Sequence, residues 1–177
     1  NIMILRRFIV FSFLLLSGYL NSQTIPSYVE NYLEKYKNLA ISEMLKHGIP
    51  ASITLAQGIL ESNYGKSLLA IKANNHFGIK CRNEWKGPVF YKNDEGGCSC
   101  YRKYKTVEQS YEDRSLFLKS KPWYSKLFTL PVYDYRGWAF GLKKAGYATD
   151  PNYAYLIINI IERYQLYKYD FIGITMN

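Results

Sequence analysis

The stretch LAQGILESNYG, residues 55–65, combines helix-forming residues with one glutamate just before a stop signal. Pro50 suits the first turn of a helix, and Gly65 lies just past its end. On a helical wheel one side carries Ile53, Leu55, Ala56, Ile59 and Leu60, and the other carries Thr54, Gln57, Gly58 and Glu61. Glu61 therefore lies on a small polar face, which is either solvated surface or the wall of a cleft.

The position of Glu61 favours an acid with a raised pKa. The helix macrodipole is negative at the C-terminal end, where it disfavours an ionised carboxylate. In a cleft, burial against Tyr64 or Phe77 would raise the pKa further. Such a carboxylic acid can protonate a leaving oxygen near neutral pH, as the general acid of a glycosidase must. Gly58 costs a helix about 1 kcal/mol relative to alanine, which suggests a close approach at that point.

The 177 residues predict a single domain behind a secretory signal. Arg6 and Arg7 precede an apolar run over residues 8–16, followed by small and polar residues. The run is shorter than the roughly 20 apolar residues that a membrane span needs, although an uncleaved anchor is the alternative. We expect a signal peptide over residues 1–22, a domain over residues 23–170 and a short tail over residues 171–177.

The charge balance is basic. Removing residues 1–22 takes away two of the 23 basic residues and none of the 14 acidic ones, so the net charge falls from +9 to +7. In an exported protein this balance suits an anionic polymer such as a bacterial cell wall, or serves solubility alone. The sequence contains no nucleic-acid recognition motif, and we expect no nucleic-acid partner.

The chain is predicted to be mostly helical with a small β insert. Apolar residues at helical spacing predict a helix over residues 26–46, and Pro50 begins a second one. Short β-prone pieces between turn signals occupy residues 77–104. Three further helices should begin at a capping box formed by Thr106 and Gln109, at Asp134, and at Asp150 with Pro151 in the first position.

Three cysteines lie within twenty residues, and export makes a disulfide plausible. Cys98 and Cys100 would point to the same side of a strand, so either could reach Cys81. We favour the pair Cys81 and Cys100, which leaves one thiol free. His47 and His76 have no partners at ligand or triad spacing, so we assign them no metal or nucleophilic role and expect no cofactor.

Five ordered blocks carry a family resemblance. They are IPASITLAQGILESNYGKS, NNHFGIKC, WKGP, CYRKYKTVEQSYEDRSLFL and GWAFGLKKAGYATDPNYAYLIINIIERY, which together cover about residues 40–168. In this order they resemble the glucosaminidase family of peptidoglycan hydrolases, typified by the flagellar rod-cap domain and many bacterial autolysins.

The resemblance implies a lysozyme-like α+β fold, in which a helical lobe and a small β-lobe flank a glycan-binding groove. It also implies an endo-β-N-acetylglucosaminidase that cleaves the β-1,4 bond after N-acetylglucosamine in peptidoglycan. We expect the protein itself to be a monomer. The general acid of the family is the glutamate of its LES block, which is Glu61 here.

A second carboxylate is often assigned to the β-lobe of this family, and Glu95 occupies that place here. Asp94, its neighbour, is a second candidate, and Glu84 is a more distant one. The alternative is that Asp94 and Glu95 have no function beyond forming a polar turn. Their separation from Glu61 would help to choose between inversion and retention. A 2-acetamido sugar can also supply its own nucleophile, so the stereochemistry stays open.

Aromatic side chains suit the apolar faces of sugar rings, and tyrosine hydroxyls can bond an acetamido group. The resemblance singles out Tyr147, Tyr153, Asn75, Phe77 and Gly78. The full set of expected substrate-binding residues is Gln57, Tyr64, Asn75, Phe77, Gly78, Trp85, Tyr147 and Tyr153. Trp85 could instead prop the β-lobe, Tyr153 could begin a buried stripe, and Trp123 and Trp138 are expected in the core.

Three other functions fit parts of the pattern. A lytic transglycosylase would share the single glutamate and form an anhydro sugar, but its usual GLMQ-like block is replaced here by NNHFGIK. A muramidase would cut the other glycosidic bond of the same polymer. A non-catalytic wall-binding module would keep the groove without needing Glu61.

Overall fold

The computed structural model describes residues 25–82, 84–94 and 96–172. Its helices and strands, in chain order, are α1 (Ser27–His47), α2 (Ala51–Ser62), α3 (Leu68–Ala73), β1 (Val89–Asp94), β2 (Gly97–Arg102), α4 (Val107–Ser120), the 3-10 helix η1 (Pro122–Thr129), α5 (Tyr135–Lys144), α6 (Tyr153–Arg163) and α7 (Lys168–Ile172). This mostly helical chain with one small sheet has the expected α+β character. Over these residues no helix is both long enough and apolar enough to cross a membrane. The expected signal peptide over residues 1–22 lies outside them, and α7 runs two residues past the expected domain end at residue 170.

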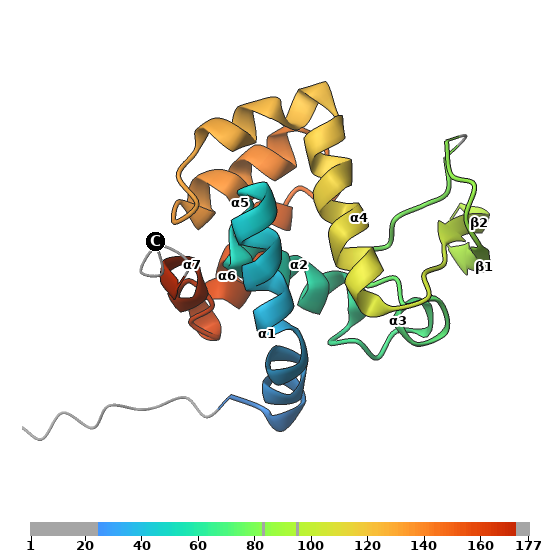
Figure 1. Ribbon diagram of the computed structural model, residues 1–177, viewed down its shortest axis with the longest axis horizontal. Helices are drawn as coiled ribbons and strands as arrows, with labels where there is room; N and C mark the ends of the chain where they lie inside the picture. Colours follow the sequence, from blue (N-terminus) through green and yellow to red (C-terminus); the bar gives the residue numbers. More distant parts are fainter. Residues whose placement is uncertain (1–24, 83, 95, 173–177) are drawn as a thin grey trace, which may run out of the picture.

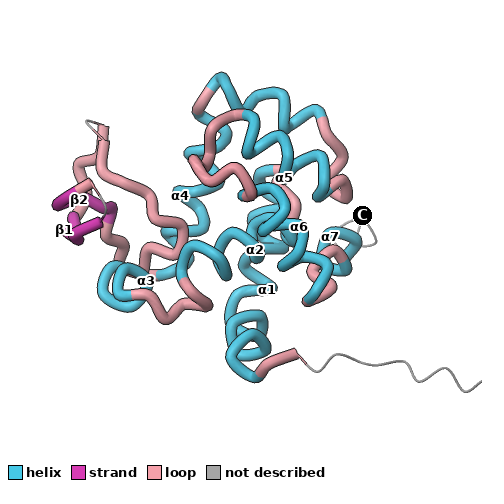
Figure 2. The backbone as a smooth tube through the Cα atoms, turned by 180° about the vertical axis from the view of Figure 1, so that it is seen from behind, coloured by secondary structure: helices cyan, strands magenta, loops and turns pink. Residues whose placement is uncertain are grey.

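Helix α2 is the central element of the helical lobe (Figures 1 and 2). It contacts α1, α5, α6 and α7, and every residue from Ala51 to Ile59 is buried. Its polar face is therefore not a surface, contrary to one interpretation of the helical wheel. Thr54 and Gln57 lie in the interior, and only Glu61 near the end of the helix is exposed.

Packing on this buried face requires a glycine at position 58. A Cβ at that position would lie 2.4 Å from the hydroxyl oxygen of Tyr32 and 3.1 Å from that of Tyr111. These two hydroxyls are 2.9 Å apart, and the Tyr32 hydroxyl is also 3.0 Å from Nδ1 of His76. Burial lowers the pKa of His76 to about 4, so its ring is neutral at pH 7. The missing side chain thus makes room for a buried polar cluster under α2.

The first turn of α2 is held by a residue from the far end of the chain. Asp170 in α7 accepts hydrogen bonds from the backbone N–H and the hydroxyl of Ser52, at 2.8 and 2.6 Å. A carboxylate at a helix N-terminus satisfies donors that have no partner within the helix. Burial nevertheless raises the pKa of Asp170 to about 6, against the lowering effect of its bonds to Ser52.

The β-lobe is a single antiparallel hairpin that lies beside α3, away from the other helices (Figure 1). Val89 pairs with Arg102 at its open end and Asp94 with Gly97 near its turn. The disulfide joins Cys81 to Cys100, with 5.3 Å between the Cα atoms, and Cys98 is an exposed free thiol. Residues 77–81, the first part of the expected β-prone region, form only an isolated bridge, between Lys80 and Tyr101.

Several details differ from the sequence-based expectations. Helix α6 begins at Tyr153 rather than Pro151, because Asp150 instead accepts a bond from the backbone N–H of Asn152 and closes a turn. The Thr106 side chain does not cap α4, although Gln109 accepts a bond from the N–H of Lys105. The short segments α3, η1 and α7 were not expected. Trp138 is fully buried as expected, but Trp123 is 53% exposed.

Candidate active site

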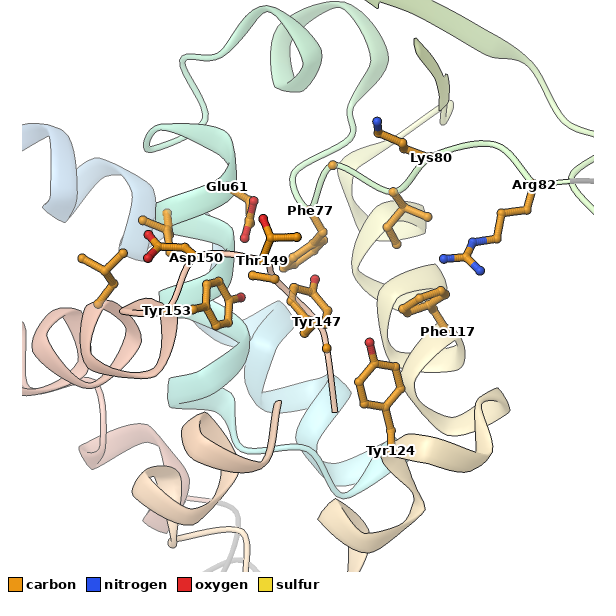
Figure 3. Close-up of a pocket in the computed structure, with 16 residues that line it drawn as sticks. Glu61, Phe77, Lys80, Arg82, Phe117, Tyr124, Tyr147, Thr149, Asp150 and Tyr153 are labelled. Carbon is orange, nitrogen blue, oxygen red and sulfur yellow. The ribbon is translucent and has the colours of Figure 1, made fainter. Parts of the chain in front are cut away.

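A groove of about 650 Å³ lies beside the C-terminal end of α2 (Figure 3). Residues from four parts of the chain line it, namely the end of α2, the loop that precedes the hairpin, α4 with η1, and the segment from Gly146 to Leu156. The lining residues are Leu60, Glu61, Phe77, Gly78, Ile79, Lys80, Arg82, Phe117, Tyr124, Gly146, Tyr147, Ala148, Thr149, Asp150, Tyr153 and Leu156. A polar acid, aromatic rings and two cations therefore share one cavity.

Glu61 stands at the rim of this groove because α2 ends immediately after it. Asn63, Tyr64 and Gly65 have φ angles of 49°, 57° and 76°, a left-handed run that turns the chain away from the helix axis. The hydroxyl of Ser62 accepts the N–H of Gly65 at 2.7 Å and fixes this turn. The Glu61 carboxyl is left facing the groove while the helix behind it is buried.

The environment of Glu61 raises its pKa from 4.5 to about 7. The larger cause is loss of solvation by the surrounding protein, and a hydrogen bond from Tyr153 lowers the pKa in part. The side chain as a whole is exposed, since the groove leaves one side open to solvent. The result is a carboxyl that is substantially protonated at neutral pH and still accessible to a ligand.

The hydroxyl of Tyr153 is itself fixed from below by Gln57. Nε2 of Gln57 donates a hydrogen bond of 2.7 Å to the Tyr153 oxygen, which leaves the phenolic hydrogen for Glu61. The Gln57 carbonyl oxygen accepts from Nη2 of Arg114, and Nη1 of Arg114 donates to the Thr54 hydroxyl at 3.1 Å. A chain of directed bonds thus runs from the protein interior to the carboxyl at the groove.

Arg114 is the unexpected member of this chain. It is fully buried, and its hydrogen-bond partners are the neutral side chains of Thr54, Gln57 and Tyr147. Within the described part of the chain Arg114 forms no ion pair with a carboxylate, and its guanidinium packs 5.6 Å from the ring centre of Phe77. Burial lowers the pKa of Arg114, and the neutral oxygens around it offset part of that cost.

Tyr147 and Tyr153 form the aromatic part of the groove wall near Glu61 (Figure 3). Their rings stack with centroids 5.7 Å apart and planes inclined by 30°. Tyr147 is half-buried, whereas Tyr153 is 2% exposed, so Tyr147 offers the larger surface to a ligand.

The side of the groove next to the hairpin carries Lys80 and Arg82. Nζ of Lys80 lies 3.0 Å from a carboxylate oxygen of Asp94, which also accepts the Tyr101 hydroxyl at 2.8 Å. Hydrogen bonds from Ser99, Lys80 and Tyr101 hold the pKa of Asp94 well below its usual range. Asp94 is therefore engaged within the hairpin and does not line the groove.

The structure brings together five of the expected site residues, Glu61, Phe77, Gly78, Tyr147 and Tyr153. The expectation of direct substrate contact needs correction for Gln57 and Asn75, because neither lines the groove and both are fully engaged inside the protein. Gln57 holds Tyr153, and the Asn75 amide bonds the backbone of Ile79 and the carbonyl of Arg102.

Tyr64 and Trp85 also lie outside this groove. Tyr64 lines a separate pocket of about 320 Å³ beside α1. Trp85 packs against Tyr104 and under the guanidinium of Arg102, so it props the hairpin, as the alternative interpretation had it.

The structure tests only some of the candidates for a second carboxylate. Glu95 lies outside the described residues. Glu84 is exposed and pairs with Arg102 at 3.6 Å and Lys121 at 3.7 Å, away from the groove. Asp150 lines the groove, yet the sequence suggested only a helix cap for it. Asp150 belongs to the block GYATDPNY, which the family resemblance already linked to the site through Tyr147 and Tyr153. That membership was the signal that could have identified Asp150 as a groove residue.

Comparison with known proteins gives concordant matches. Residues 37–166 match the family described as mannosyl-glycoprotein endo-beta-N-acetylglucosaminidase. The exo-glucosaminidase LytG of Bacillus subtilis is 40% identical over 136 residues, which are 71% of this chain and 48% of that protein. The peptidoglycan hydrolase FlgJ of Salmonella typhimurium is 33% identical over 129 residues, covering 66% of this chain and 40% of FlgJ.

A similar solved structure is the catalytic domain of the autolysin Auto from Listeria monocytogenes. It superposes with a TM-score of 0.70 at 26% identity, over 83% of this chain and 90% of that domain. The chain spans about half the length, or less, of the curated relatives described above.

Proposed function

The chain belongs to the glucosaminidase family, and from that premise we propose that it hydrolyses peptidoglycan with Glu61 as the general acid. The bond cleaved is the β-1,4 bond after N-acetylglucosamine, within the glycan strand. We further propose that the protein acts outside the cytoplasm, where this polymer lies, and that it works as a monomer.

The observation that carries this proposal is the pKa of Glu61, raised to about 7 at the edge of a groove of about 650 Å³. A general acid works best when its pKa lies near the operating pH. The bond from Tyr153 fixes the carboxyl in orientation, and the Gln57 contact fixes Tyr153. The protonated oxygen of Glu61 would donate its proton to the bridging oxygen as the sugar leaves.

The positive charge that develops at the anomeric carbon needs a negative or nucleophilic partner. Glu95 is the proposed second carboxylate. Asp150 offers a carboxylate on the groove wall itself, and the carbonyl oxygen of the 2-acetamido group is a third source. Inversion, retention and substrate assistance each leave a different product anomer or intermediate, so the stereochemical outcome separates them.

The remaining lining residues support binding of an anionic glycan. Tyr147 presents aromatic surface, whereas Phe77 lines the groove from the core and is only 4% exposed. At Gly78 a Cβ would meet no atom within 4 Å, so the backbone there is open to a ligand. Lys80 and Arg82 place positive charge where the stem-peptide carboxylates of peptidoglycan could pass.

The proposal is tested by muropeptide release from purified peptidoglycan by the wild type and by Glu61→Gln. Wild type should release soluble fragments, and the variant should bind the polymer without releasing them. Borohydride reduction of the fragments should label N-acetylglucosamine at the new reducing end.

Other products would point to other functions. Labelled N-acetylmuramic acid would identify a muramidase, the activity in the name of a 31% identical Lactococcus lactis relative, and an anhydro end would identify a transglycosylase. Large oligomers at early times indicate internal cleavage, whereas single sugars indicate action from the chain ends. Equal release by wild type and Glu61→Gln would refute the role of Glu61.

A further inference from the structure

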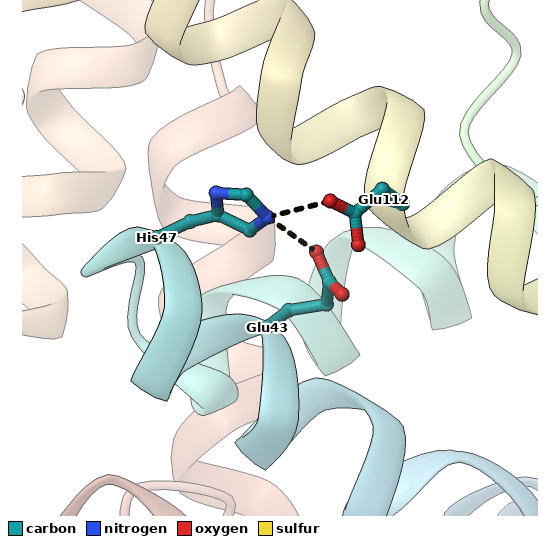
Figure 4. A group of neighbouring side chains, drawn as sticks. All are labelled: Glu43, His47 and Glu112. Carbon is teal, nitrogen blue, oxygen red and sulfur yellow. Dashed lines mark hydrogen bonds and ion pairs between the residues drawn. The ribbon is translucent and has the colours of Figure 1, made fainter.

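A second cluster of ionisable side chains lies between α1 and α4 (Figure 4). Glu43 and His47 are one turn apart on α1, and Glu112 faces them from α4. Nε2 of His47 lies 3.5 Å from Oε2 of Glu43 and 3.0 Å from Oε1 of Glu112. None of these residues lines the groove, so the proposed hydrolysis leaves this cluster unexplained.

We propose that Glu43, His47 and Glu112 form a binding site for a divalent transition-metal ion of the Zn²⁺ type. Zn²⁺ bonds nitrogen and oxygen at about 2.0–2.2 Å, and a tetrahedral arrangement then separates its ligand atoms by about 3.3 Å. The two distances from His47 lie on either side of that value, and ligand atoms from all three residues lie within 4.8 Å of one another. One imidazole with two carboxylates suits Zn²⁺ and leaves a coordination position for water.

The state of Glu43 points independently to a ligand. Its side chain is 1% exposed. Among the residues that the structure describes, its Oε2 atom accepts no hydrogen bond, although it points toward Nε2 of His47 at 3.5 Å. A buried carboxylate oxygen without a donor is costly, and a coordinated cation removes that cost. Two carboxylates and a neutral imidazole also balance the charge of a divalent ion.

Lys46 is the cation that a metal ion must replace. Its Nζ atom lies 3.3 Å from Oε2 of Glu112 and 3.7 Å from Oε1 of Glu43. The Lys46 side chain is 55% exposed on a flexible stem, so it can turn into solvent when the carboxylates coordinate a metal. The Glu112 side chain is 40% exposed, which opens a path for the ion to enter.

The role that follows is structural. Glu43 and His47 belong to the last two turns of α1, and Glu112 lies 65 residues after His47 on the helix that also carries Arg114. A bound ion would join these two helices behind the groove wall. We therefore expect it to raise the melting temperature without taking part in bond cleavage.

The test measures Zn²⁺ binding by calorimetry and Co²⁺ binding by visible absorption. It uses the full chain carrying Cys98→Ser, because the exposed Cys98 thiol could itself bind Zn²⁺. One equivalent should bind and raise the melting temperature. Glu112→Gln and His47→Gln should abolish both effects, and Glu34→Gln should abolish neither, since Glu34 is a carboxylate on the same helix that pairs with Lys37.

Lys46→Gln gives a result that unfolding cannot mimic, because it removes the competing cation. It should tighten Zn²⁺ binding by about twofold to fivefold, the factor that one exposed ion pair contributes. Absence of binding in the parent protein would overturn the proposal. Binding that survives His47→Gln unchanged, or that weakens in Lys46→Gln, would overturn it as well.

Discussion

The two walls of the groove are built from different kinds of interaction. On the α2 side, Glu61 is backed by Tyr153, Gln57 and Arg114, which are buried and joined by directed hydrogen bonds. On the hairpin side, Lys80 is held by an exposed ion pair with Asp94. A disulfide at Cys81 ties the same loop to the hairpin.

This difference suggests that the α2 wall carries the chemical step and the hairpin wall carries substrate binding. Buried hydrogen bonds act in a low dielectric and lose much energy when broken, so they fix an acid in one orientation. Exposed ion pairs contribute about 0–1 kcal/mol and rearrange easily. The α2 wall is therefore suited to the proposed proton transfer, and the hairpin wall to the proposed binding of the glycan. Changes on the α2 wall should lower kcat, and changes on the hairpin wall should raise KM.

The largest effect is expected for Glu61→Gln, which removes the transferable proton and keeps the shape. Its kcat should fall by about 10²–10⁴-fold, the range for loss of a general acid. Fragment release from purified peptidoglycan measures it, and circular dichroism checks the fold. A decrease below tenfold would place the acid elsewhere in the groove.

Raising the pH should remove the proton from Glu61 and lower activity without any mutation. The raised pKa of about 7 means that the free enzyme loses its acid form above that pH, so kcat/KM should fall by about tenfold for each further unit. From about pH 4.5 to about pH 7 the unfolded chain ionises Glu61 while the folded chain keeps the proton, so this group makes folding less favourable as pH rises. A rate profile and urea unfolding at several pH values measure both effects. A rate that stays constant to pH 9 would contradict the assignment.

Gln57→Leu tests the support behind the acid. The substitution removes both bonds that Gln57 makes, leaves Arg114 without one acceptor, and frees the Tyr153 hydroxyl. We expect kcat to fall by about tenfold, which corresponds to about 1.4 kcal/mol, with the alkaline limb of the pH profile shifted. Leu69→Ala, in the separate small hydrophobic cluster beside the hairpin, is the matched control and should leave that limb in place.

Removing the disulfide tests the role of the hairpin wall. Closing a loop of 19 residues contributes about 3 kcal/mol to stability, and removing it should loosen the segment that carries Lys80 and Arg82. The double variant Cys81→Ser and Cys100→Ser should therefore raise KM several-fold with little change in kcat. Steady-state kinetics on soluble glycan fragments separate the two parameters. A selective loss of kcat would mean that this wall contributes to the chemistry.

Asp94→Asn should have the smallest effect. The substitution weakens the exposed ion pair with Lys80 and keeps an acceptor for Tyr101, so we expect less than about a threefold change in kcat/KM. A loss comparable to that of Glu61→Gln would instead make Asp94 a catalytic carboxylate. The same assay as for Glu61→Gln decides between them.

The sequence predicts the central helix and its acid because both depend on local signals. One continuous segment contains the signals for the start of the helix at Pro50, for its end near Gly65, and for Glu61 between them. The wheel was less informative about the other polar residues of α2. Thr54 and Gln57 look like surface residues on an isolated helix. Partners far along the chain, Arg114 and Tyr153, make them interior residues.

The parts that sequence reasoning missed share this dependence on distant partners. Asp150 looked like a helix cap, but the helix begins later and its carboxylate lines the groove. Of the two carboxylates beside His47, Glu43 is one helical turn away and was readable from the sequence, whereas Glu112 lies 65 residues away. Trp123 looked like a core residue by type, yet η1 turns it outward. Spacing along the chain cannot reveal contacts that form only when helices pack.

The bond between Asp170 and Ser52 also orders events during synthesis. The helix that carries Glu61 emerges from the ribosome early, but the acceptor for its first turn is made more than a hundred residues later. A nascent chain must therefore leave α2 without this cap until almost the whole domain has been translated. For the proposed peptidoglycan hydrolase, completion of the helix that carries Glu61 is thereby coupled to completion of the fold.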